Sequence, residues 1–321
     1  MSQSRRAAWL RSAGAANHQS FFATEAAQAG GLVHHRNGGT ITCVAGGEAQ
    51  VAFAEVSEAD ASAFADDALA VVRRHLPLNQ LGWWSLNECA PTVLGPRLLA
   101  RGFDWGWRPN WMALDVATLV EDIPPPKGLV ITPVDGHLEA TLDGHRLGSV
   151  AHHVCDFDGQ LVGGVYATEV DAAARRQGIG TALTVASCRR LRELGCEHVL
   201  LNATAMGVPV YLRAGFTLLG EAGQTWWMMK DRIEGQQPSR PEVAFVEAIG
   251  TGDLAAAATA LQMSERDLDA PLTCGLSPLG VAAVTKQQGS GRWLVSQGAT
   301  PDVVSAWDLG WHDEVNDLLA K

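Results

Sequence analysis

Residues 161–181 read LVGGVYATEVDAAARRQGIGT and carry more structural information than any other stretch of the chain. The first ten, Leu161 to Val170, alternate apolar side chains with small or polar ones, which predicts a β-strand. After a turn with two glycines, apolar residues recur at helical spacing and stop at Gly195. These residues are Ala182, Leu183, Ala186, Leu191 and Leu194. The stretch therefore predicts a strand, a glycine-rich turn and a helix.

The turn has the chemistry of an anion site. Gly178 and Gly180 let the backbone approach a ligand closely, and the first-turn N–H groups of the helix point outward at the positive end of its dipole. Arg175 and Arg176 add positive charge in a chain whose net charge is −11. We therefore expect this turn to bind phosphate. The Walker pattern and the G-x-G-x-x-G dinucleotide pattern with a downstream acid are both absent, which excludes the two commonest nucleotide loops.

Hairpin signals precede the strand. Asp143-Gly144 and Asp158-Gly159 each lie between runs of alternating apolar residues, and Asp-Gly is a strong short-range signal for a β-hairpin. We expect an antiparallel meander that ends at Val170. Two further strands are expected downstream, namely Val199 to Leu201 and a final strand with Trp226, Trp227 and Met228.

Three features at set distances carry a family resemblance. They are Val170 five residues before Arg175, the pattern R-x-x-G-x-G over Arg175 to Gly180, and Tyr211 four residues before Gly215-Phe216. Together with their strand and helix, these features resemble the GNAT N-acyltransferase superfamily over about Gly128 to Arg232. The resemblance implies an α+β (α/β three-layer) fold and acetyl-CoA as co-substrate.

The resemblance also implies where acetyl-CoA would bind. Its pyrophosphate would lie on the amides of Gln177 to Thr181, and its pantetheine would hydrogen-bond the strand end near Val170. The implied cofactor-binding residues are Val170, Arg175, Arg176, Gln177, Gly178, Ile179, Gly180 and Thr181.

The family's reaction suggests the catalytic roles. A neutral amine attacks a thioester, so the departing thiolate needs a proton donor and the amine needs a proton acceptor. Tyr211 matches the family's donor, and the alternative is a core tyrosine packed on the last strand. Glu169 is the candidate base, although alternation puts it on the face opposite Val170 unless a bulge intervenes. A solvated surface glutamate, a water chain, or a relay through His152 or His153 remain alternatives.

The first half of the chain mirrors the second. Val56, which we expect to close a strand that begins at Gln50, precedes Gly102-Phe103 by 46 residues, as Val170 precedes Gly215-Phe216 by 45. LLARGF at residues 98–103 mirrors YLRAGF at residues 211–216, and Trp111-Met112 mirrors Trp227-Met228. These matches indicate an internal duplication and predict two tandem GNAT-like halves.

The first half lacks the expected active residues. When the two halves are aligned so that Val56 matches Val170, Ala61 to Asp67 aligns with the phosphate turn. Phe64 then replaces Gly178, and Asp66 replaces Gly180. Leu98 replaces the tyrosine. Bulk and negative charge would exclude pyrophosphate, so we expect this degenerate half to bind no CoA and to wall the acceptor cleft.

Aromatic residues are concentrated in the first half. We expect them to fill the core, with an aromatic acceptor pocket as the alternative. They are Trp83, Trp84, Trp105, Trp107 and Trp111, and polar candidates for the pocket are Asn87 and Glu88.

The last eighty residues have a repeat of their own. Ala248 and Ala282 are 34 residues apart, as are Leu261 and Val295, close to the ankyrin period of about 33. Residues 277–283 (SPLGVAA) and 293–302 (WLVSQGATPD) resemble the start and close of an ankyrin repeat. Such repeats either bind a partner protein or dock on the catalytic unit and support self-association; both options stay open.

Proline-containing connectors separate three expected domains. Residues 121–128 (EDIPPPKG) and 234–241 (EGQQPSRP) read as linkers. The expected domains are a degenerate GNAT-like domain at 1–120, a catalytic GNAT domain at 128–232 and all-α ankyrin-like repeats at 242–321.

Composition narrows the class of protein. A net charge of −11 argues against nucleic-acid binding. The six cysteines are scattered without a C-x-x-C pair, and neighbouring histidines on a strand point to opposite faces, so we expect no metal site. No apolar stretch reaches the ~18 residues of a membrane span, and polar residues interrupt any export signal after Arg5-Arg6. We therefore expect no membrane association and a cytoplasmic protein.

These observations lead to one principal hypothesis. We expect an acetyl-CoA-dependent N-acetyltransferase that acetylates a primary amine of a small molecule, in detoxification or antibiotic resistance. One alternative is a protein acetyltransferase that recruits its target through the ankyrin-like tail. Another is an acyl-CoA-binding sensor or scaffold without turnover.

Overall fold

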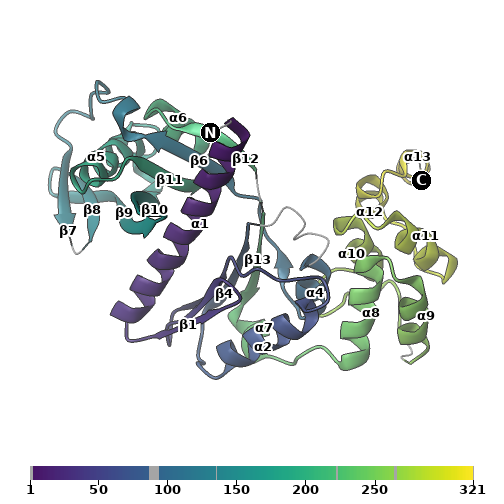
Figure 1. Cartoon of the computed structure of the whole chain (residues 1–321). Coiled ribbons are helices and arrows are strands. Elements are labelled where there is room, and N and C mark those ends of the chain that lie inside the picture. The colour runs from purple at the N-terminus through teal and green to yellow at the C-terminus, as the bar shows by residue number, and fades with distance from the viewer. Residues whose placement is uncertain (1–2, 87–93, 135, 222, 264–265, 321) are drawn as a thin grey trace. The chain divides into compact units, whose positions relative to one another are not determined.

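The computed structural model describes residues 3–86, 94–134, 136–221, 223–263 and 266–320, which form two compact units (Figure 1). Unit 1 combines Met1–Gln28 with Arg108–Ala222, and unit 2 combines Ala29–Trp107 with Gly223–Lys321. None of the helices in this described part of the chain has the length and apolarity needed to cross a membrane.

Unit 1 is built on a seven-stranded sheet in the order β12-β6-β11-β10-β9-β8-β7. Only β10 and β11 pair in parallel. The expected hairpins are confirmed, because Asp143-Gly144 and Asp158-Gly159 have positive φ at both positions and join neighbouring strands. The strands are β6 (Asn110–Asp115), β7 (Val130–Val134), β8 (His137–Leu142), β9 (His145–Phe157), β10 (Gln160–Val170), β11 (His198–Ala203) and β12 (Thr217–Glu221).

Helices cover both faces of this sheet. On one face, α5 (Ile179–Glu193) buries Leu183 and Leu191 against β8, β9 and β10, and α6 (Val208–Arg213) packs the partly buried Val208 and Tyr211 on the same core. On the other face, α1 (Gln3–Gln28) packs Leu10 and Ala13 on Val162 and Leu200 (Figure 1). The expected three-layer arrangement of mixed α/β structure is therefore present, with the N-terminal helix as one layer.

Unit 2 contains a six-stranded sheet in the order β1-β2-β3-β4-β13-β5. Its core is formed by strand residues and by the apolar face of α2 (Ala61–Arg73), including Phe64 and Leu69. The strands are β1 (Leu32–Arg36), β2 (Gly39–Cys43), β3 (Glu48–Ala52), β4 (Gln80–Ser85), β5 (Asp104–Trp105) and β13 (Gln224–Met229), and the short helices are α4 (Gly95–Ala100) and α7 (Lys230–Glu234).

Each sheet contains a strand from the other half of the sequence. The β6 strand, which ends the first half, lies between β11 and β12, and β13, which ends the second half, lies between β4 and β5. Trp111-Met112 and Trp227-Met228, the mirrored pairs, lie on these two strands. The units therefore differ from the expected domains 1–120 and 128–232. The sequence did not indicate this exchange of strands, because an apolar strand has the same pattern in whichever sheet it is buried.

The tryptophans of the first half mostly fill cores. Trp83 and Trp111 are each 1% exposed and Trp84 is also buried, as expected for core residues. Trp105 and Trp107 are half-buried, and their rings pack edge-on against other tryptophans of unit 2. Asn87 and Glu88 lie outside the described residues.

The C-terminal segment forms three consecutive helix pairs. Four of the six helices begin at a side chain that accepts a hydrogen bond from a first-turn amide, namely Ser239, Asp253, Ser277 and Asp302. The ankyrin character of the pairs stays a prediction. The pairs are α8 (Arg240–Thr251) with α9 (Leu254–Gln262), α10 (Pro278–Val284) with α11 (Gln288–Ser296), and α12 (Val303–Asp308) with α13 (His312–Leu319).

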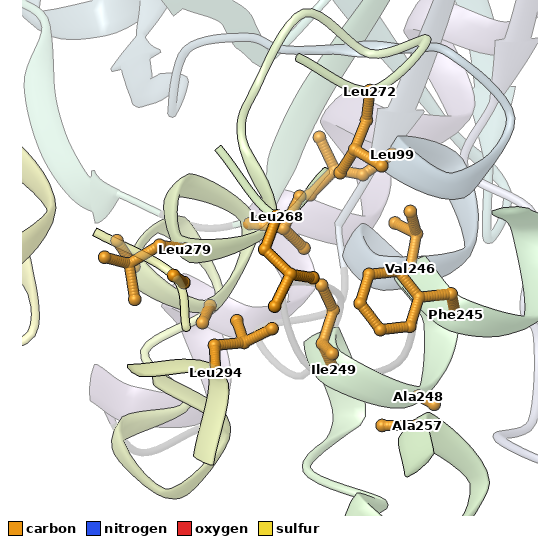
Figure 2. Close-up of a cluster of buried hydrophobic side chains, with 14 of the residues drawn as sticks. Leu99, Phe245, Val246, Ala248, Ile249, Ala257, Leu268, Leu272, Leu279 and Leu294 are labelled. Atoms are coloured by element: carbon orange, nitrogen blue, oxygen red, sulfur yellow. The ribbon is translucent and has the colours of Figure 1, made fainter. Parts of the chain in front are cut away.

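These helices share a core with the preceding part of unit 2. Leu99 of α4 packs with Phe245, Val246 and Ile249 of α8 (Figure 2). The segment 242–321 is therefore part of unit 2 and not a separate unit, because its first helix buries its apolar face on α4.

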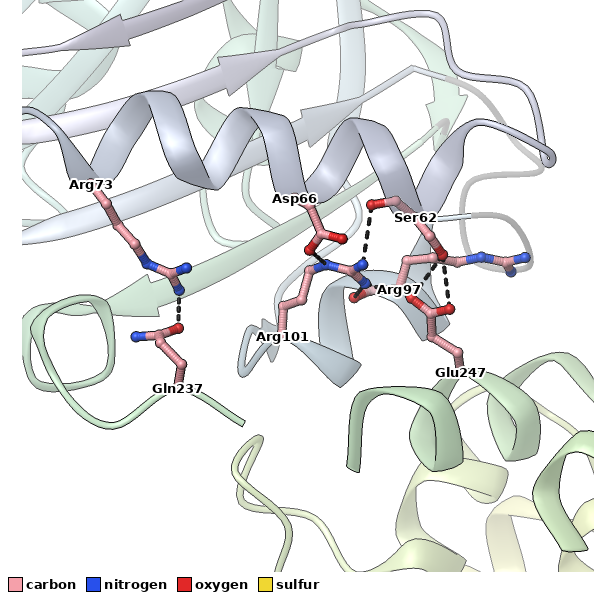
Figure 3. A network of polar contacts seen from close by, with 7 residues as sticks. All are labelled: Ser62, Asp66, Arg73, Arg97, Arg101, Gln237 and Glu247. Atoms are coloured by element: carbon pink, nitrogen blue, oxygen red, sulfur yellow. Dashed lines mark hydrogen bonds and ion pairs between the residues drawn. The ribbon is translucent and has the colours of Figure 1, made fainter. Parts of the chain in front are cut away.

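A polar network borders that core. The side chain of Arg101, 5% exposed, donates to Asp66 at 2.6 Å and to Glu247 of α8 at 2.5 Å, and Ser62 donates to Glu247 at 2.8 Å (Figure 3). Arg73 donates to Gln237 in the same region. Because a buried guanidinium is costly without partners, these bonds specify how α8 sits on α2 and α4.

Candidate active site

The parallel strands β10 and β11 separate part of the way along the sheet. They pair only from Val162 to Gly164 on β10 and from His198 to Leu200 on β11. Beyond that point β10 continues to pair with β9 up to Val170, while β11 continues to pair with β6. The facing edges of β10 and β11 form an opening where backbone groups are available to an extended ligand.

A β-bulge shapes β10 along this opening. Tyr166 pairs with Ala151 and Glu169 pairs with Ser149, so β10 has one more residue than β9 between the two pairs. The bulge puts Glu169 on the same face as Tyr166, which is the α1 face. Val170 packs into the core beneath α5, so Glu169 and Val170 lie on opposite faces, as alternation predicted.

The turn after β10 has the conformation that its glycines predict. Arg176 has φ 67° and Gly178 has φ 88°, and α5 begins at Ile179. The first intrahelical bond is made by the amide of Ala182 to the Gly178 carbonyl at 3.0 Å. The amides of the preceding first turn therefore point out of the helix end, as an anion site requires.

The charged side chains of the turn are exposed. Arg175 donates from Nε to the Val170 carbonyl at 3.1 Å, which ties the turn to the end of β10. Arg176 and Gln177 are also exposed. The turn and the opening thus meet at Val170, so the cofactor residues named from the sequence lie together in one region of unit 1.

Tyr211 lies on α6, on the α5 face of the opening. Its ring packs edge-on against Phe216 with centroids 5.8 Å apart. Burial raises the pKa of the Tyr211 hydroxyl, and the nearby Thr168 hydroxyl acts in the opposite direction. Since Thr168 lies in the bulge of β10, the phenol is a protonated group beside the opening.

The α1 face of the opening holds a buried polar network that sequence reasoning missed. Tyr166 donates to the Asn17 side-chain oxygen at 2.5 Å, and the Asn17 amide donates to the Val162 carbonyl at 2.9 Å. The Asn202 amide lies 3.3 Å from Nδ1 of His18. Burial lowers the pKa of His18 to about 3, so its ring stays neutral. Helix α1 thus holds β10 and β11 on either side of their separation.

The two neighbouring histidines of β9 lie on opposite faces, as expected. His153 lies on the α1 face, where Nε2 is 2.9 Å from the Ser20 hydroxyl, and its pKa is lowered by burial and by His152. His152 lies on the α5 face. Among the residues that the structure describes, no group of three potential metal-binding side chains occurs.

Among the residues that the structure describes, β3 and β4 of unit 2 show no such opening. The β3 strand pairs with β4 along its whole length, and the amide of Phe53 then donates to the Trp84 carbonyl at 2.8 Å. The expected strand end at Val56 is wrong, because β3 ends at Ala52. A fully paired pair of strands offers no edge to an extended ligand.

The alignment of the phosphate turn with residues 61–67 is also wrong. Helices α2 and α5 begin 118 residues apart, so Asp60 and not Phe64 corresponds to Gly178. Phe64 is a core residue packed edge-on against Trp83, and Asp66 accepts a hydrogen bond from Arg101. The valine-based offset failed because the first-half strand ends at Ala52, four residues before Val56, whereas the second-half strand does end at Val170. Leu98 does occupy the position of Tyr211, as the fourth residue of α4.

Comparison with known proteins shows what the chain is similar to. Residues 98–216 match the model of the acetyltransferase (GNAT) family, and this range contains the opening, the turn and Tyr211. A mycothiol acetyltransferase of Amycolatopsis mediterranei is 35% identical over 131 residues, 38% of this chain and 41% of that protein. One from Saccharomonospora viridis is 43% identical over 63 residues, 19% of this chain and 21% of that protein. The chain spans less than half the length of these curated relatives.

Solved structures that the chain matches include a GCN5-related N-acetyltransferase from Kribbella flavida. Its TM-score is 0.46 at 14% identity, covering 70% of this chain and 94% of that one. A tandem GNAT protein from the clavulanic acid biosynthesis pathway has a TM-score of 0.42 at 14% identity, covering 60% of this chain and 78% of that one.

Proposed function

We propose that the protein is an acetyl-CoA-dependent N-acetyltransferase acting on a primary amine of a small molecule. The observation that carries this proposal is the opening between β10 and β11, which has the phosphate turn at its end and Tyr211 beside it. The amides of residues 177–181 would hold the pyrophosphate, with Arg175 and Arg176 adding charge. The edge of β10 near Val170 would bond the pantetheine.

The residues on the two faces of β10 suit different steps. Acetyl-CoA supplies an acetyl group activated as a thioester. The amine nitrogen bonds to the acetyl carbon as the C–S bond breaks, and Tyr211 gives its proton to the sulfur. The amine loses its proton on the α1 face, where Glu169 is exposed and where burial lowers the pKa of His153. Glu169, His153 or a chain of waters accepts it, and Glu169 is our first candidate.

One cofactor site per chain is expected. In the first half, β3 and β4 stay paired and Asp60 precedes α2 where Gly178 precedes α5, so this half is proposed to be degenerate and to bind no CoA. Calorimetric titration of the full chain with acetyl-CoA should give a stoichiometry of one. A stoichiometry of two would mean that the first half also binds CoA.

The acceptor is the open part of the proposal. The matched relatives are named mycothiol acetyltransferases, which favours a small-molecule acceptor. We also propose that the reaction serves detoxification or antibiotic resistance. The test is release of free CoA thiol with a panel of primary amines, amino sugars and aminoglycosides included. Turnover above the amine-free rate supports transfer, whereas tight acetyl-CoA binding without turnover on any amine would favour an acyl-CoA sensor.

Protein acetylation is the second candidate function. It would use the C-terminal helices to recruit a target. Because α8 shares a core with α4, these helices have a structural role within unit 2 that requires no partner. Acetylation of a folded protein substrate, lost after substitution of exposed Val304 or Trp307 on α12, would favour this candidate over a small-molecule acceptor.

A further inference from the structure

A groove of about 890 Å³ lies along the flank of α5 in unit 1, over β7, β8 and β9. We call it the α5 flank groove. Its apolar lining includes Leu129, Ile131, Leu138, Val185 and Ala186. Its lining residues are distinct from those of the phosphate turn and of the opening between β10 and β11. Its volume lies in the range of about 300–1,000 Å³ typical of small-molecule sites.

The proline-containing segment 121–128 forms one wall of the groove. The Glu121 carboxylate accepts from Arg192 at 2.6 Å and from Arg189 at 2.9 Å, and its carbonyl accepts from Arg189 at 3.1 Å. These hydrogen bonds hold the pKa of Glu121 below its usual value. Ile123 and Pro125 then line the groove. The segment expected to be a linker is thus held against α5.

One part of the groove is polar and cationic. The Nδ1 atom of His152 is buried and has no hydrogen-bond partner among the described residues. The pKa of His152 is lowered by burial and then by the nearby Arg190 and His137. Arg190 also pairs with Glu193 at 3.2 Å, but both side chains are more than half exposed. Such an exposed pair is weak, so a ligand carboxylate can compete with Glu193.

We propose that the α5 flank groove binds a small carboxylic acid, with its apolar body on Ile131, Leu138 and Val185 and its carboxylate at Arg190 and His152. The apolar lining favours burial of a hydrocarbon body. The positive charge of Arg190 beside His152 favours an anionic head over a cationic one of the same size. The proposal does not depend on acetyl transfer, because it uses neither the phosphate turn nor Tyr211, Glu169 or His153.

Octanoate is a suitable probe, with octylamine as a cationic compound of equal chain length. Isothermal titration calorimetry of the full chain should show one octanoate site. Octylamine should bind at least fivefold more weakly. The octanoate carboxylate would form an ion pair with the exposed Arg190, whereas the octylamine ammonium group would be repelled by it. Equal affinity for the two compounds would overturn the carboxylate assignment.

Two variants locate the site. Ala186→Trp fills the groove and should abolish octanoate binding, and Arg190→Glu should weaken it at least tenfold. Arg6→Glu is the matched control, because Arg6 is 53% exposed and pairs with Asp115, whereas Arg190 is 52% exposed and pairs with Glu193. The control should bind octanoate like the wild type. Wild-type affinity in both groove variants would overturn the proposal.

Saturating acetyl-CoA separates this site from the proposed cofactor site. Octanoate affinity should be unchanged, because the two sites share no assigned residue. Competition between the two ligands would mean that octanoate enters the opening between β10 and β11, and this would overturn the groove assignment. Loss of acetyl-CoA binding alone would count against the proposed function and leave the groove result intact.

Discussion

Replacing Gly178 by aspartate is expected to weaken acetyl-CoA binding at least 100-fold, or by about 2.7 kcal/mol. The added carboxylate would lie where the first-turn amides of α5 and the positive end of its dipole should meet pyrophosphate. The side chain would also fill the space that the glycine leaves for a close approach. Calorimetric titration with acetyl-CoA measures the effect directly.

The Gly144→Asp variant separates this effect from backbone strain. Gly144 has φ 81°, close to the 88° of Gly178, and lies in the β8–β9 turn with nothing within 4 Å of an added Cβ. Both substitutions put a non-glycine residue in the left-handed region and should lower stability to a similar extent. Only Gly178→Asp should lose acetyl-CoA. Unchanged affinity in that variant would place the phosphate elsewhere.

The Tyr211→Phe variant is expected to lower turnover about 100-fold with acetyl-CoA affinity within about twofold of wild type. General acid catalysis typically contributes ~10²–10⁴-fold, and the phenol is the group that would protonate the departing sulfur. The ring and its packing on Phe216 remain. Thiol release under saturating amine gives the rate, and calorimetry gives the affinity.

The pH dependence provides a second readout. Because burial raises the pKa of Tyr211, the phenol should stay protonated up to and above its ordinary value of about 10. At pH values up to 9, wild-type turnover should therefore show no decrease caused by loss of this proton. Phe216→Leu is the packing control, since it disturbs the same contact and keeps the hydroxyl. An equal loss of turnover in both variants would make Tyr211 a packing residue.

The local parts of the candidate site were predictable from the sequence. The strand to Val170, the turn and α5 follow from side-chain periodicity and from glycines at positions that need positive φ or close approach. Tyr211 was located by its distance from Gly215-Phe216. Such features depend on residues close together in the chain, so a single sequence contains them.

The α1 network and the wall of the groove were not predictable. Asn17 and Tyr166 are 149 residues apart, and no local pattern marks either as a partner of the other. Segment 121–128 was expected to be a connector because proline runs are extended, yet Glu121 binds Arg189 and Arg192 through charges visible only once α5 is in place.

The sequence by itself determined the hairpins before β10, the strand to Val170, the glycine turn and α5, and it predicted phosphate binding at that turn and two related halves. Tertiary structure alone decided that β6 and β13 each join the sheet of the other half, that β10 and β11 separate while β3 and β4 stay paired, and that α1 holds the opening. The physical reason is that periodicity and turn chemistry act over a few residues, whereas the choice of strand partner depends on backbone hydrogen bonds between distant segments and on which buried surfaces fit together.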